Sequence, residues 1–344
     1  MTIKRILASL LSLTLTLSLL TGCAKEGSAP LRMDIGGGVA NLDPQFATDS
    51  AGCTIIANCF EGLLQKDSEG NIVAGAAESY KVSSDGLTYT FFLRSDAKWN
   101  DGETVTAEDF AFALGRLFHP QVPSPYAEEF LMIKNAPAVL SGELPQTMLG
   151  VTAKDSATLE ITLSEPSPLF TDRLTSTAAM PCNEKFFTET RARYGLEEGY
   201  LKFNGAYRVS HWDNSKYIEM SPNKHYHTRG ELPFPEVYLY TSRKTETKTA
   251  LDLFNEGKSD IYMATAEELA KITVKDTSYM EIKNKVWQLI FSAEYGELGN
   301  EDIRRSLVLS LDSSGYRERI PEMYGLASGI IPESARPRGL MLPT

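Results

Sequence analysis

The most informative part of the sequence runs from Trp99 to Phe110 and reads WNDGETVTAEDF. The Asn-Asp-Gly run at 100–102 is typical of a tight turn, because glycine accepts a positive φ and aspartate tolerates one. Thr106 then stands where a hydroxyl can cap the first turn of a helix, and the acidic residues after it suit the positive helix start. The stretch therefore predicts a turn followed by a capped helix.

One face of this predicted helix is apolar, through Phe110, Leu114, Leu117 and Phe118. Spacings of four, seven and eight residues place such side chains toward a core, and the helix is expected to end near residue 119. Strands are predicted where apolar and polar residues alternate, at 32–35, 88–94, 158–163, 206–209, 217–220, 237–240 and 260–262. Helical periodicity is predicted at 49–64 and 247–256. The predicted order of helices and strands is therefore mixed.

Length and charge narrow the class of protein. A chain of 344 residues suits two or three lobes rather than one core. Its formal net charge is −11, and loss of a leader with Lys4 and Arg5 would make it two units more negative. Nucleic acid is therefore not expected as a partner, because phosphate binding needs a basic surface.

The first residues have the pattern of an export signal. Lys4-Arg5 precedes an apolar run from Ile6 to Leu20, which is too short to span a membrane. The run ends in Leu-Thr-Gly-Cys, a lipobox, so residues 1–23 are predicted to be a leader that is cut before Cys23. Two acyl chains on Cys23 would anchor the protein on the outer or periplasmic side of a bacterial cell membrane. An ordinary secretory leader with a chance cysteine is the alternative.

Catalytic and metal-binding patterns are weak. His225 and His227 form an H-x-H pair without a completing ligand, and they are predicted to be surface histidines. Cys53, Cys59 and Cys182 are expected to be buried free thiols, since Cys53 and Cys59 fall on different faces of a helix and free cysteine packs as a small hydrophobe. No nucleophile elbow, zinc motif or phosphate loop is complete. Neither an enzyme nor a cofactor or metal is therefore predicted.

Several motifs resemble the family-5 solute-binding proteins of ABC importers, which include oligopeptide-, dipeptide- and nickel-binding proteins. The resemblance rests on NLDP (41–44), FEGL (60–63), AESY (77–80), YTFFLR (89–94) and WNDGETVTAEDF (99–110). The oligopeptide-binding branch in particular is similar at SPYA (124–127), LEITLSEP (159–166) and NGAY (204–207). A late family helix resembles the segment from Arg304 to Asp312.

The resemblance implies a periplasmic-binding-protein-like two-lobe α/β fold (type II, cluster C). Lobe I would be discontinuous, formed by residues 24–60 and 182–285. A small α/β domain at 61–181 would be inserted in it, and lobe II would begin at 286 and run to 344. Family members extend well beyond residue 344, so the second lobe is expected to be incomplete. A fragment, a split gene or a truncated product would each explain that, and this chain alone would bind peptide weakly or not at all.

The resemblance also implies a function and a site. The protein would capture short peptides and deliver them to ABC permease subunits that work with cytoplasmic ATPases. The backbone of Thr48, Asp49 and Ser50 would pair with the peptide, and Tyr126 would contact it. Another cargo (nickel chelate, haem or a signalling peptide) is an alternative, and a secreted lipoprotein hydrolase is a more distant one.

Overall fold

The computed structural model describes residues 29–35, 37–228, 232–241, 248–275, 277–279, 291–294 and 296–310. They divide into two units, each described by itself. Unit 1 comprises Met1–Ala250 with Lys258–Tyr262, and unit 2 comprises Leu251–Gly257 with Met263–Thr344. The predicted leader and Cys23 lie outside the described residues.

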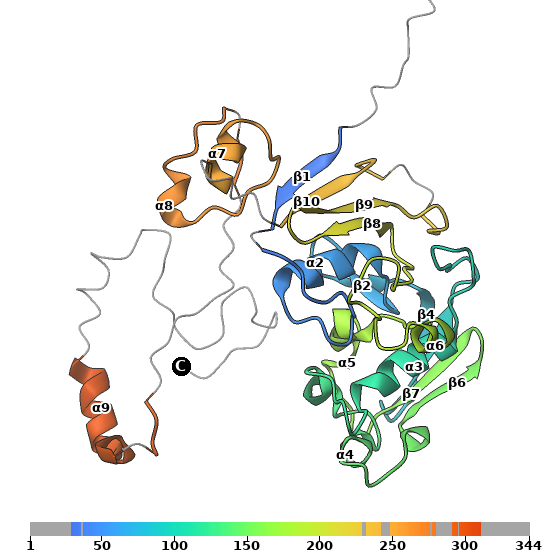
Figure 1. Ribbon diagram of the computed structural model, residues 1–344. Helices are drawn as coiled ribbons and strands as arrows, with labels where there is room; N and C mark the ends of the chain where they lie inside the picture. The colour runs from blue at the N-terminus through green and yellow to red at the C-terminus, as the bar shows by residue number, and fades with distance from the viewer. Residues whose placement is uncertain are drawn as a thin grey trace, which may run out of the picture. The chain divides into compact units, whose positions relative to one another are not determined.

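The first sheet of unit 1 joins a strand from the start of the chain to three strands from much later (Figure 1). In sheet order they are β1 (Leu31–Asp34), β10 (Val237–Tyr240), β9 (Tyr217–Pro222) and β8 (Tyr207–Asp213). β1 runs parallel to β10, with Leu31 opposite Val237, and the other neighbours are antiparallel. The buried residues alternate along β9, at Ile218 and Met220, as its predicted pattern requires.

Helix α2 (Ser50–Cys59) packs against this sheet through β8, and its buried residues include Ile55 and Ile56. It also contacts the short helix η3 (Thr177–Ala179), which in turn contacts α3 (Ala107–Leu117). Figure 1 shows α2 between the first sheet and the region of α3. The segment just before α2 therefore lies near both the first sheet and the region of α3.

Helix α2 is shorter than the predicted 49–64, because the chain becomes extended after Cys59. The side chain of Asn204 hydrogen-bonds to both backbone groups of Glu61. Its Oδ1 accepts from the N–H at 3.1 Å, and its Nδ2 donates to the carbonyl at 2.8 Å. Gly205 lies so close that a Cβ there would be 2.5 Å from the carbonyl carbon of Cys59. A segment distant in sequence thus ends the helix.

The second sheet draws on a continuous stretch of the chain. Its strands, in sheet order, are β4 (Ala77–Val82), β5 (Thr88–Leu93), β7 (Thr158–Thr162) and β6 (Val151–Asp155), all antiparallel. A hairpin of β2 (Leu64–Lys66) and β3 (Ile72–Ala74) precedes it. Tyr89, Phe91 and Leu93 are buried at alternate positions of β5, which confirms the predicted strand.

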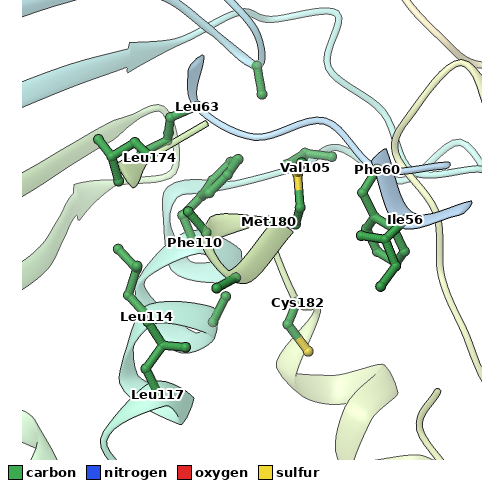
Figure 2. Packing of buried hydrophobic residues seen from close by; sticks show 14 of the residues in the cluster. Ile56, Phe60, Leu63, Val105, Phe110, Leu114, Leu117, Leu174, Met180 and Cys182 are labelled. Atoms are coloured by element: carbon green, nitrogen blue, oxygen red, sulfur yellow. The ribbon is translucent and has the colours of Figure 1, made fainter. Parts of the chain in front are cut away.

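Helix α3 covers β6 and β7, and Figure 2 shows Phe110, Leu114 and Leu117 along its buried side. The turn before it is confirmed, with Gly102 at φ +93°. Asp109 explains the spacing of the motif at 99–110. Its Oδ2 accepts from the Trp99 indole at 3.1 Å and from the Thr106 N–H at 2.9 Å. Trp99 itself is fully buried.

The remaining described helices of unit 1 are η1 (Ala127–Phe130), α4 (Ala136–Leu140), η2 (Gln146–Met148), α5 (Phe170–Arg173) and α6 (Glu184–Glu189). Unit 2 contains α7 (Ala250–Asn255, whose first residue belongs to unit 1), α8 (Ala266–Leu269), η4 (Gly296–Gly299) and α9 (Glu301–Ser310). The strand predicted at 260–262 is reduced to one bridge between Ile261 and Met33.

The mixed α/β class is confirmed by these sheets and helices. The boundaries predicted for lobe I, the inserted domain and lobe II remain a prediction. The first sheet combines strands from both ends of unit 1, and the second sheet uses residues 77–162 alone, an arrangement that fits an insertion.

Candidate ligand-binding loop

The predicted site residues Thr48, Asp49 and Ser50 lie where the chain enters α2. We call residues 41–50 the ligand loop. Thr48 and Ser50 are exposed, whereas Asp49 is half-buried and caps the helix, its Oδ1 accepting from the Gly52 N–H at 2.7 Å. The carboxylate of Asp49 therefore has a structural partner in the first turn of α2.

The backbone of the ligand loop is extended at Asp49, with φ −79° and ψ 146°, where the chain bends into α2. Among the residues that the structure describes, none accepts a hydrogen bond from the N–H of Thr48 or Asp49, and none donates one to the Thr48 carbonyl. Extended backbone with free donors and an acceptor can pair with an added peptide strand.

Tyr126, which was predicted to contact the peptide, lies beside the ligand loop, and its hydroxyl is engaged by the loop itself. It donates to the Ala47 carbonyl at 2.5 Å, and the Cys53 thiol donates to the same oxygen at 3.5 Å. Burial raises the pKa of Tyr126 to about 12, so the phenol remains a donor at neutral pH. The Ala47–Thr48 peptide bond is trans, so this contact directs the Thr48 N–H away from Tyr126.

The buried side of the loop holds residues that the sequence did not reveal as part of a site. Arg116 of α3 donates to the carboxylate of Asp43 and to the side chain of Gln45. One signal was available: Arg116 follows the buried Ala113 by three residues, so it stands next to the apolar face of its helix. An arginine in that position needs a buried partner.

The interpretation of both histidines as surface residues is wrong for His227. Its side chain is only 5% exposed, and its Nε2 lies 2.8 Å from Glu61 Oε2. Tyr226 donates to the other oxygen of Glu61 at 2.8 Å. The burial of Glu61 calls for such partners, which a turn-rich sequence does not indicate. His225 is exposed, with its ring near Gly102, so the two rings do not converge.

The cysteines and the potential metal ligands are the remaining groups of chemical interest. Within the described ranges no group of three or more His, Cys, Asp or Glu side chains could hold a metal ion. Cys59 and Cys182 are buried free thiols, as predicted, whereas Cys53 is free but only half-buried. None of the described helices has the length and apolar character required to span a membrane.

Comparison with known proteins gives a consistent result. The family model described as "Bacterial extracellular solute-binding proteins, family 5 Middle" matches residues 71–337. The oligopeptide-binding protein OppA of Bacillus subtilis is 29% identical over 304 residues, which cover 86% of this chain and 55% of the relative. The chain thus spans about half the length of the curated relatives it matches.

Solved structures agree with the fold. The Escherichia coli murein tripeptide binding protein MppA is similar with a TM-score of 0.76 and 28% identity, over 90% of this chain and 60% of that protein. Listeria monocytogenes OppA bound to peptide is similar with the same TM-score and 25% identity, over 90% and 61%. These similarities confirm the periplasmic-binding-protein-like fold, and the match to the family model extends over more than half of the sequence. The chain belongs to the bacterial extracellular solute-binding proteins of family 5.

Proposed function

We propose that the protein captures short peptides outside the cytoplasmic membrane and delivers them to the permease of an ABC importer. The observation that carries this proposal is the backbone at Thr48 and Asp49, whose N–H groups have no partner among the described residues and which is extended at Asp49. A peptide in extended form offers the matching carbonyl and N–H groups, whatever its side chains. The relative from Listeria monocytogenes was solved with a peptide bound, which supports the same class of cargo.

The energetics suit a transport protein. Each backbone hydrogen bond contributes about 1 kcal/mol net, so a handful of them with modest apolar burial gives about 8 kcal/mol. That corresponds to a Kd of about 1 μM, which permits both capture and release. In this proposal Thr48, Asp49 and Ser50 contact the peptide through their backbone, and Tyr126 holds the Ala47 carbonyl on the side opposite the Thr48 N–H.

The proposal includes the cellular setting. The lipobox ending at Cys23 supports a protein that is anchored by two acyl chains to the outer face of the membrane. An anchored binding protein stays near the permease subunits and their cytoplasmic ATPases. Radiolabelled palmitate incorporation, and its loss in Cys23→Ser, tests the anchor independently of cargo.

Thermal unfolding with added peptides tests the capture step. The protein, expressed from its complete reading frame, is heated with a mixture of di- to pentapeptides. A ligand at about 100 times its Kd should stabilise the native state by about 2.7 kcal/mol and raise the Tm. Free amino acids are the first control. The second is the same peptides with N-methylated amides, which keep their side chains but lose the backbone donors.

The outcomes separate the cargo classes. Stabilisation by peptides, and not by N-methylated peptides, supports backbone pairing at the ligand loop. Stabilisation only by haem or by a nickel chelate would refute peptide capture while leaving the family assignment intact. Release of new peptide termini during incubation would instead indicate a hydrolase.

A further inference from the structure

Arg116 is a buried charge that connects α3 to the inner side of the ligand loop. Arg116 is 9% exposed, and its Nη1 donates to Asp43 Oδ1 at 3.0 Å. Nη2 donates to the second oxygen of the same carboxylate, and Nη1 also donates to Gln45 Oε1 at 2.5 Å. A guanidinium has the planar fork that two parallel bonds to a carboxylate require.

The surroundings keep this ion pair away from water. The ring centroids of Phe46, Phe187 and Tyr194 lie 5.5, 4.2 and 5.3 Å from the guanidinium carbon of Arg116. Although burial lowers it, the hydrogen bond and the charge of Asp43 raise the pKa of Arg116 above its ordinary value. Arg116 is therefore charged throughout the physiological range, and its interaction with Asp43 is little screened by salt.

Further contacts hold the same side of the loop. The side-chain amide of Gln45 donates to the carbonyls of Ala178 at 3.1 Å and Met180 at 2.9 Å. The backbone carbonyl of Gln45 accepts from the Ser124 hydroxyl at 2.5 Å. Gln45 is thus fixed at both its side chain and its backbone, and its side-chain oxygen is the group that Arg116 holds.

The loop also meets a glycine that no other residue could replace. The Leu42 N–H donates to the Gly195 carbonyl at 2.7 Å. Gly195 has φ +77°, and a Cβ there would lie 2.4 Å from the backbone nitrogen of Asp43. The inner half of the loop is therefore bonded at 42, 43 and 45, whereas the N–H groups of the outer half, at 48 and 49, have no acceptor in the described part of the chain.

We propose that Arg116 is a positioning residue that fixes the ligand loop from behind, so that the Thr48 and Asp49 N–H groups are presented before any ligand arrives. The proposal rests on the proposed function, because the loop that it fixes is the one assigned to peptide. A loop that is already ordered loses less conformational entropy on binding, which favours affinity. Arg116 does not touch the ligand and acts through Asp43 and Gln45.

Native-state alkylation by iodoacetamide tests the positioning directly, because the chain contains its own reporter. Cys53 is half-buried and its Sγ lies 3.5 Å from the Ala47 carbonyl, so its reactivity reports opening of the loop. Cys59 is fully buried, 3.6 Å from the Met220 sulfur, and burial raises its pKa, so it reacts only when the core opens. Mass spectrometry of the digested protein gives each rate separately.

Two variants and a matched control decide the result. Arg116→Lys keeps the charge but loses the fork, and Arg116→Met removes both. Arg32→Lys is the control, since Arg32 also makes a two-bond ion pair, with Asp260, in another part of unit 1. We expect alkylation of Cys53 to accelerate at least tenfold in Arg116→Lys while Cys59 stays at least a hundredfold slower than Cys53.

The proposal is overturned if the Cys53 rate changes less than threefold in both variants of Arg116. It is equally overturned if Cys59 reacts as fast as Cys53, because the opening is then global and Arg116 is merely structural. If Arg116→Met does not fold, Arg116→Lys alone decides. Failure of the peptide-capture proposal is recognised separately, by unchanged thermal unfolding of the wild-type protein with peptides, whatever the Cys53 rates.

Discussion

Unit 1 contains two ion pairs of the same chemistry in different surroundings. Arg116–Asp43 joins α3 to the ligand loop, and its side chains are 9% and 8% exposed. Arg32–Asp260 joins β1 to a segment 228 residues away, and its side chains are 34% and 39% exposed. Both use two guanidinium nitrogens, so the difference lies in burial. Water can replace either partner of the exposed pair, whereas nothing replaces a lost partner of the buried one.

Removal of the buried arginine should have the largest effect. Arg116→Met leaves the Asp43 carboxylate buried without its partner, which should lower the free energy of unfolding by about 3–5 kcal/mol. Urea denaturation followed by circular dichroism measures it. The double variant Arg116→Met with Asp43→Leu removes both charges and should be more stable than the single variant. A loss below about 1 kcal/mol in the single variant would contradict the assigned burial.

The second buried pair, His227 with Glu61, should lose less stability when its histidine is removed, because the Glu61 carboxylate keeps another donor. His227→Ala leaves the Glu61 carboxylate with Tyr226 as its side-chain donor, at a cost of about 1–3 kcal/mol. His225→Ala is the matched control on an exposed ring and should stay within about 0.5 kcal/mol. Equal losses in both variants, measured by urea denaturation, would show that burial does not distinguish the two histidines.

Tyr126→Phe should have a smaller effect, since Tyr126 is only half-buried. The change removes the hydroxyl that donates to Ala47, and the Cys53 thiol remains as a weak donor to the same carbonyl. The expected loss of unfolding free energy is about 0.5–1.5 kcal/mol. Alkylation of Cys53 should also accelerate, and an unchanged rate would indicate that the phenol does not restrain the loop.

Removal of the exposed pair should have the smallest effect. Arg32→Met should cost about 0–1 kcal/mol, because both side chains are solvated without each other. Its small contribution should also disappear at high salt, whereas the effect of Arg116→Met should not. Denaturation of the two variants at low salt and in 1 M sodium chloride compares them, and equal salt dependence would contradict the difference in burial.

Local patterns predicted the secondary structure well where the deciding contacts are local. The alternation from Thr88 to Arg94 predicted β5, which pairs with the adjacent β4, and the turn before Ala107 predicted α3. The end of α2 could not be predicted, since it depends on Asn204 bonding to Glu61 across 143 residues. The burial of His227 was missed for the same reason, as its partner lies 166 residues away.

The candidate site was predicted from motifs that resemble a known family, not from periodicity or packing arguments. The motif NLDP indicated Thr48 to Ser50, and SPYA indicated Tyr126. The structure places Tyr126 beside the loop. The part behind the loop was not foreseen, because Arg116 and Asp43 are 73 residues apart and no periodicity connects them. Which charged residue of a helix turns inward is decided by tertiary packing.

The parallel pairing of β1 with β10 has a consequence for how the protein folds. Leu31 pairs with Val237, so this pairing closes a loop of about 200 residues at a large cost in chain entropy. The second sheet uses only residues 77–162 and closes shorter loops. We expect folding to begin there, with the first strand of the chain among the last to be incorporated.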